Sequence, residues 1–99
     1  MMYVVLFEDN PSIQTDIRKK HMPEHLSFLE ERSSRFIAAG PLKPTEKNEN
    51  SAGMWIVDAE RESDVRALIN EDPFWPTGLR KSYRIFEWTR VFADGRRLI

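Results

Sequence analysis

The sequence predicts a single α+β domain spanning residues 1–99, in which two helices cover one face of a four-stranded antiparallel sheet. Three observations support this fold class. Short runs rich in β-branched and aromatic residues indicate strands, and apolar residues three or four positions apart indicate helices. The two kinds of segment also alternate along the chain. Its 99 residues are 40% hydrophobic and 31% charged, proportions typical of one folded domain.

The first half of the chain predicts a strand followed by a helical region. Residues 2–8 form the strand, which ends at the turn-forming residues 9–12. The helical region is expected from about Ile13 to Ala39, as two helices or as one kinked helix, because Pro23 interrupts it. Gly40-Pro41 predicts its end, since glycine favours the helix C-terminus and proline prevents continuation.

The second half predicts the same order again. Residues 42–51 are polar and loop-like, with room for a short strand at their start, and residues 53–57 are a clear strand. Ser63 is expected to cap a second helix, which ends at Asp72-Pro73 because the residue before proline avoids helical geometry. Residues 83–92 alternate as a last strand. Two βαβ units with right-handed crossovers then give a ferredoxin-like βαββαβ sandwich, with both helices on one face.

The sheet is predicted to be apolar on both faces. In the last strand Tyr83 and Ile85 point one way, while Phe86 and Trp88 point the other. Two helices can cover only one face, and a large exposed apolar face is unusual for a soluble monomer. A homodimer that packs sheet against sheet is therefore expected. The alternative is that loop 43–52 and the tail 93–99 cover the second face.

Charge and composition exclude several function classes. The net charge of −1 and the pI near 6.1 provide no positive field for nucleic acid. The chain has no cysteine, which excludes a disulfide framework and a thiolate metal site. Its N-terminal apolar run has no basic segment before it and ends at the acidic pair Glu8-Asp9, which is not the pattern of a signal peptide. No stretch is long enough to span a membrane. A cytoplasmic protein is expected.

The motifs of common cofactor and nucleophile sites are also missing. The four glycines are too far apart for a nucleotide-binding loop, and no serine lies in a nucleophile elbow, so no cofactor is predicted. His21 and His25 are four residues apart, a spacing that can bind a metal ion. Pro23 lies between them and no third ligand is evident, so no metal site is expected either.

His25 is the first candidate for chemistry. It lies three and four residues before Phe28 and Leu29, which places it at the edge of the apolar stripe, facing the sheet. A partly buried imidazole near a carboxylate is suited to general acid–base chemistry near neutral pH. Most buried histidines are instead simply hydrogen-bonded to a neighbouring group. The sequence alone leaves both interpretations open.

Asp72 is the second candidate. It precedes Pro73, an arrangement in which aspartate commonly caps a new turn. The same carboxylate follows the negative end of a predicted helix, where it is mildly unfavourable. Bulky Phe74 and Trp75 come next and are able to line a pocket. For Asp72 taken alone, the capping role is the simpler explanation.

Several short motifs follow one another in a recognisable order. They are residues 3–7, His25-Leu26-Ser27-Phe28-Leu29, Ala39-Gly40-Pro41-Leu42, the strand from Gly53, Asp72-Pro73-Phe74, Gly78-Leu79 and the strand 83–92. Each motif is weak by itself, but the ordered set spans nearly the whole chain. In this respect the sequence resembles the YciI-like family, whose proteins contain a YCII-related domain.

The resemblance implies a ferredoxin-like fold that dimerises through its sheets, as in the dimeric α+β barrel proteins. It also implies a histidine and an aspartate that meet in one pocket, here His25 and Asp72. One characterised branch eliminates chloride from a chlorinated hydroxyquinone, and related barrel proteins include isomerases acting on lactones. Family members often carry an arginine three residues before the histidine, where this chain has Met22. If that arginine holds an anionic substrate, this chain has either lost the contact or supplies it in another way, from Arg18 or His21.

The leading hypothesis is a small cofactor-free enzyme of the lyase or isomerase type, acting on a small and partly apolar metabolite. His25 would move the proton, while Asp72 would orient the imidazole and stabilise its charged form. The alternative is a non-catalytic module that binds a small ligand, or regulates, through the same pocket. RNA binding on the sheet is disfavoured by the net charge.

Overall fold

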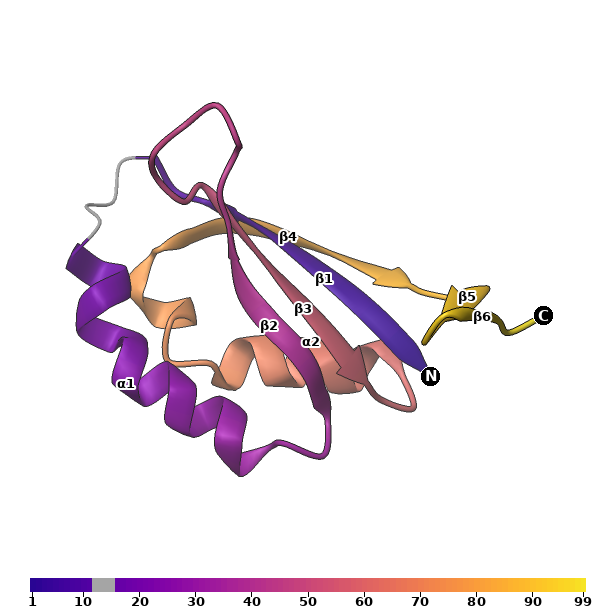
Figure 1. Cartoon of the computed structure of the whole chain (residues 1–99). Coiled ribbons are helices and arrows are strands. Elements are labelled where there is room, and N and C mark those ends of the chain that lie inside the picture. The colour runs from indigo at the N-terminus through magenta and orange to yellow at the C-terminus, as the bar shows by residue number, and fades with distance from the viewer. Residues whose placement is uncertain (12–15) are drawn as a thin grey trace.

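Four strands form one antiparallel sheet in the order β2-β3-β1-β4 (Figure 1). The computed structural model describes residues 1–11 and 16–99. The strands of the main sheet are β1 (Met2–Asp9), β2 (Phe36–Leu42), β3 (Ala52–Asp58) and β4 (Arg80–Glu87). Helices α1 (Asp16–Glu31) and α2 (Glu62–Glu71) lie together on one face of this sheet (Figure 1). The order and layers confirm the predicted ferredoxin-like βαββαβ fold.

Three shorter elements complete the chain. A single 3-10 turn, η1 (Trp75–Thr77), separates α2 from β4. After β4, the short strands β5 (Phe92–Ala93) and β6 (Arg96–Arg97) pair only with each other and form a hairpin at the C-terminal end. In the described part of the chain, no helix combines the length and apolar character that a membrane crossing requires.

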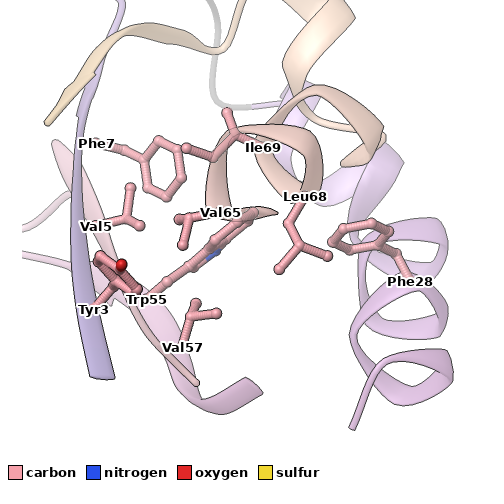
Figure 2. Packing of buried hydrophobic residues seen from close by; sticks show 9 residues of the cluster. All are labelled: Tyr3, Val5, Phe7, Phe28, Trp55, Val57, Val65, Leu68 and Ile69. Atoms are coloured by element: carbon pink, nitrogen blue, oxygen red, sulfur yellow. The ribbon is translucent and has the colours of Figure 1, made fainter. Parts of the chain in front are cut away.

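The core lies between the inner face of the sheet and the two helices. Alternate residues of β1 and β3 point inward and meet apolar side chains of α1 and α2, as Figure 2 shows. The buried residues of this hydrophobic core are Tyr3, Val5, Phe7, Phe28, Trp55, Val57, Val65, Leu68 and Ile69. Trp55 is its centre, because its ring packs edge-on against Phe7 at 4.9 Å and Phe36 at 4.8 Å between centroids.

The outer face of the sheet is also apolar, as the alternation predicted. Val4 pairs with Ile56 on one side and with Phe86 on the other, so these three side chains form a row across the sheet. All three are half-buried within the monomer, while Leu6 and Trp88 are exposed. Both helices lie on the opposite face of the sheet (Figure 1).

The predicted extension of the first helix to Ala39 is wrong. The helix α1 ends at Glu31, a turn follows, and residues 36–42 form the edge strand β2. Phe36 is recruited to the core by its contact with Trp55 rather than by a helical stripe. Gly40-Pro41 is not a helix stop but part of β2. Proline is tolerated there because β2 pairs only with β3 and leaves its other edge unpaired.

Pro23 does not divide α1, which is one continuous helix from Asp16 to Glu31. Of the two forms that the sequence left open, the structure therefore has one helix. Proline lacks an amide N–H and so removes one hydrogen bond to the preceding turn, at a position where its ring is exposed. The predicted start near Ile13 falls outside the described residues.

Two further boundaries differ from the prediction. Helix α2 begins at Glu62 with Arg61 before it, so Ser63 lies inside the helix and does not cap it. Strand β4 runs from Arg80 to Glu87, so it begins earlier than expected and Phe92 belongs to the separate hairpin. The polar tail expected at residues 93–99 contains the rest of that hairpin.

Candidate active site

The fold brings His25 and Asp72 into direct contact across 47 residues of sequence. His25 Nδ1 lies 2.9 Å from Asp72 Oδ1. The Asp72 side chain is completely buried and the His25 side chain is 9% exposed. His25 comes from the middle of α1 and Asp72 from the C-terminal end of α2, so the pair also ties the two helices together.

The Asp72-Pro73 turn explains how the carboxylate is held. Asp72 terminates α2 in an extended conformation, as expected for a residue before proline. Its Oδ1 then accepts a hydrogen bond of 3.0 Å from the Phe74 backbone N–H. The capping role and the contact with His25 therefore coexist at one oxygen. The same turn places the Phe74 ring against the imidazole, with the ring centroids 4.4 Å apart.

Arg80 completes this cluster, and sequence reasoning missed it. Its guanidinium NH1 donates to Asp72 Oδ2 at 2.6 Å, and its side chain is 7% exposed. The guanidinium carbon lies 3.9 Å from the Phe7 ring centroid and 5.4 Å from that of Trp55. Two core aromatic rings thus surround a cation that would otherwise be costly to bury.

A bulge in the sheet puts Arg80 on the inner face. Ser82 pairs with Glu8 and Arg80 pairs with Asp9, so Lys81 is an extra residue in β4. Strict alternation from Tyr83, which points inward, would have turned Lys81 inward and Arg80 outward. The bulge reverses this and brings Arg80 and Asp9 to the same side of the sheet. No sequence pattern distinguishes Arg80 from the other basic residues.

The partners of Asp72 keep it ionised. Burial by itself would raise the pKa of Asp72, but the hydrogen bond from His25, the charge of Arg80 and the Phe74 N–H together lower this pKa below its ordinary value. Burial lowers the pKa of Arg80, which remains charged beside Asp72. An ionised carboxylate only accepts hydrogen bonds, so His25 Nδ1 carries the proton in this contact. In the neutral imidazole, Nε2 is then the basic nitrogen.

His25 lines a small cavity of about 100 Å³. Phe74, Trp55 and Phe7 form apolar parts of its wall, and Arg80 lies beside them. A wider, open cavity of about 880 Å³ adjoins it. The two cavities share four lining residues, which are Asp9, Arg18, Met22 and Leu26.

The family resemblance made three residues of α1 relevant to ligand contact, namely Met22, Arg18 and His21. Met22 lies at the junction of the two cavities, so an apolar side chain occupies the place of the family arginine. Arg18 lies four residues earlier in α1 and lines both cavities. His21, the other candidate for the missing contact, lines neither cavity, and its Nδ1 lies 3.6 Å from Glu24.

No metal centre is built from the described residues. Within residues 1–11 and 16–99, histidine and carboxylate side chains nowhere gather in a group of three that could hold an ion. His21 and His25 have different partners, Glu24 and Asp72 respectively. The spacing of four residues between them therefore does not create a shared site.

The comparison with protein families decides the assignment. A model of the YCII-related domain matches residues 1–89. The chain belongs to the YCII-related domain family. The matched range contains His25, Asp72 and Arg80 and ends between β4 and the C-terminal hairpin. Among curated proteins, none matches the sequence.

Solved structures show the same fold. The chain is similar to 5-chloro-2-hydroxyhydroquinone dehydrochlorinase (TftG) of Burkholderia phenoliruptrix AC1100, in its complex with 2,5-dihydroxybenzoquinone, with a TM-score of 0.79 at 22% identity. This match covers 90% of the chain and 94% of TftG. A NIPSNAP domain protein from Burkholderia xenovorans gives a TM-score of 0.50 at 10% identity, over 94% of the chain and 98% of that protein. At these identities the likeness supports the fold alone.

Proposed function

We propose that this member of the YCII-related domain family is a small enzyme that uses His25 as a general acid–base, in a lyase or isomerase type of reaction. The observation that carries the proposal is the contact between His25 Nδ1 and the ionised, buried Asp72. This contact leaves Nε2 as the ring nitrogen available to a ligand in the cavity that His25 lines.

The proposed reaction begins with proton transfer to Nε2. The His25 lone pair takes a proton from a carbon or hydroxyl of the substrate, and the bonding electrons remain on the substrate. These electrons then either take back the proton at another atom, which is an isomerisation, or expel a leaving group, which is an elimination. Asp72 and Arg80 hold the imidazole in position, and Asp72 stabilises its charged form. Positioned proton transfer of this kind contributes about 10²- to 10⁴-fold in rate.

A small, planar, hydroxylated ring is the substrate that we favour. The inner cavity is small, and three aromatic side chains are among those that line it, Phe7, Trp55 and Phe74. TftG is a dehydrochlorinase of a hydroxylated ring compound and has been crystallised with 2,5-dihydroxybenzoquinone. Shared fold makes this a guide to the chemical class and not to the individual substrate.

We also propose that the chain works as a homodimer through the outer face of its sheet. The row formed by Val4, Ile56 and Phe86 crosses three adjacent strands, and Leu6 and Trp88 extend it with exposed apolar side chains. Packing the same face of a second copy against it would bury this surface across a two-fold axis.

The test combines a reaction screen with ring NMR. Hydroxylated quinones and unsaturated lactones are incubated with the protein, and products are followed by mass spectrometry. We expect His25→Gln to abolish any turnover, whereas His21→Gln, which alters a histidine of the same helix outside both cavities, leaves it unchanged. In ¹⁵N spectra, neutral His25 is expected with its proton on Nδ1. Asp72→Asn should disturb this tautomer, since an amide can donate as well as accept.

Two outcomes contradict the proposal. Turnover that survives His25→Gln would show that another group moves the proton. A His25 ring protonated on Nε2 in the wild-type protein would show that Asp72 does not direct the basic nitrogen toward the cavity. Ligand binding without conversion across the screen would favour the non-catalytic binding module.

A further inference from the structure

Asp9 and Arg18 form a second ion pair at the site, next to Arg80, with which Asp9 pairs in the sheet. Asp9 ends β1 and Arg18 lies in the first turn of α1, and Arg18 NH2 donates to Asp9 Oδ2 at 2.6 Å. Their side chains are 13% and 18% exposed, respectively, so the pair is largely removed from solvent. Both residues line the inner and the outer cavity. A ligand that enters from the outer cavity toward His25 must pass this pair.

One oxygen of this pair has no partner among residues 1–11 and 16–99. Asp9 Oδ1 is buried and accepts no hydrogen bond from any residue in the described parts of the chain. Buried carboxylate oxygens are nearly always satisfied, because leaving one unpaired is costly. Because Asp9 lines both cavities, a ligand in them is a candidate donor for this oxygen.

Arg18 adds donors next to this acceptor. A guanidinium has five N–H donors, and the contact with Asp9 uses NH2. The Arg18 guanidinium carbon lies 6.0 Å from the centroid of the Phe74 ring, the ring against which His25 packs. Arg18 and the imidazole thus both lie near the Phe74 ring.

We propose that Asp9 and Arg18 orient the ligand by binding two neighbouring oxygens, one with a hydrogen and one without. Asp9 Oδ1 accepts the ligand hydroxyl, and Arg18 donates to the adjacent oxygen, which is a carbonyl, an ionised hydroxyl or a second hydroxyl. This inference rests on the proposed function and narrows its substrate class from hydroxylated rings to those with vicinal oxygens. Met22 takes no part in this recognition, because a thioether offers no strong donor or acceptor.

The experiment uses three coloured probes that differ at one position. They are 4-nitrocatechol, its methyl ether 2-methoxy-4-nitrophenol, and 4-nitrophenol, and their dissociation constants are measured by visible absorption titration. In the wild-type protein we expect 4-nitrocatechol to bind about ten- to a hundredfold more tightly than the other two, the range for a hydrogen bond to a charged group. Only 4-nitrocatechol has a free hydroxyl at the variable position.

Variants then locate the effect. Asp9→Leu, which keeps a similar size but removes the acceptor, should bring the three dissociation constants together. Arg18→Met should weaken the binding of all three probes, because each carries the oxygen to which Arg18 donates. Glu8→Gln is the matched control, since Glu8 is the preceding residue of β1 and lines neither cavity. Equal binding of the three probes to the wild-type protein, or no binding, overturns the inference without any variant. A ratio unchanged in Asp9→Leu also overturns it.

The same titrations test the proposed role of His25 through a separate observation, the absorption band of the bound probe. If His25 takes the phenolic proton, bound probes show the phenolate band at a pH where the free probes are protonated, and His25→Gln removes that band. The affinity ratio reports Asp9 and the common loss of affinity in Arg18→Met reports Arg18, whereas the band reports His25. Failure of one reading therefore leaves the other interpretable.

Discussion

Replacing Arg80 with methionine tests whether the buried charge cluster supports the fold. Arg80 NH1 lies 2.6 Å from Asp72 Oδ2, and the Asp72 side chain is completely buried. The substitution retains an apolar side chain against Phe7 but leaves a buried carboxylate without its cation. Breaking a buried pair in this way costs about 3–5 kcal/mol. Because small domains are stable by about 5–15 kcal/mol in total, Arg80→Met should remove a large share of the free energy of unfolding.

Urea unfolding monitored by tryptophan fluorescence measures this loss. The matched control is Arg66→Met, because Arg66 NH2 also lies 2.6 Å from its partner Glu62, but both side chains are 53% exposed. Exposed pairs contribute about 0–1 kcal/mol, so the control should change little. The two substitutions thus compare equal ion-pair distances at different burial. A loss below about 1 kcal/mol for Arg80→Met would refute the reasoning, since burial would then add nothing to the pair.

Arg80→Met should also change how the stability of the protein depends on pH in acid. Arg80 helps to lower the pKa of Asp72, so without Arg80 the carboxyl takes up its proton at a higher pH. A carboxyl whose pKa is lowered by folding stabilises the protein above its unfolded pKa of about 3.9, and this stability is lost as the pH falls through the folded pKa. Arg80→Met should therefore begin to lose the Asp72 contribution at a higher pH than the wild-type protein does. Acid unfolding curves of the two proteins at one denaturant concentration would show this shift.

Three other measurements follow from the structure. Asp72→Asn should lose less stability than the wild-type protein below about pH 3.9, because the substituted side chain does not titrate there; parallel acid curves would contradict this. Ile56→Lys on the outer face of the sheet should convert a dimer to an 11.7 kDa species in sedimentation, whereas Ala67→Lys on an exposed part of α2 should not. Gly95→Ala should loosen the C-terminal hairpin by about 1–2 kcal/mol because Gly95 has φ of +78°, and faster exchange of the Leu98 amide, which bonds within the hairpin, measures it.

The central strands could be predicted from the sequence because residues 2–8 and 53–57 are short runs rich in β-branched and aromatic residues. Such a composition indicates a strand even where both faces of the strand are apolar. Edge elements were harder to predict. Strand β2 contains Gly40-Pro41, a strong helix-ending signal that overrode the weaker evidence for a strand. The C-terminal hairpin does have a sequence signal, the dipeptide Asp94-Gly95, which favours a two-residue hairpin turn and has positive φ at both positions.

The candidate site was predictable only in part. His25 and Asp72 lie in distinctive local settings, an apolar helix edge and an Asp-Pro turn, and the family resemblance implied that they meet in one pocket. Arg80 and Asp9 become neighbours only through the bulge at Lys81, and a single extra residue in a strand leaves no trace in the hydrophobic pattern. Side chains selected by tertiary geometry in this way are beyond reasoning from periodicity.

The arrangement of charges is consistent with the proposed role of a single histidine in this cavity. The cavity lining contains the ion pair Asp9–Arg18. A second ion pair, Asp72–Arg80, contacts the imidazole through Asp72, so each of the two carboxylates already has a cation as partner. With both pairs balanced, protonation of His25 is the step that changes the net charge of the cluster. A neutral ligand that gives its proton to Nε2 therefore becomes an anion at the moment when its surroundings become positive, and the two charges stabilise each other in a poorly solvated space. A ligand that arrives already ionised gains this attraction only if His25 was protonated beforehand.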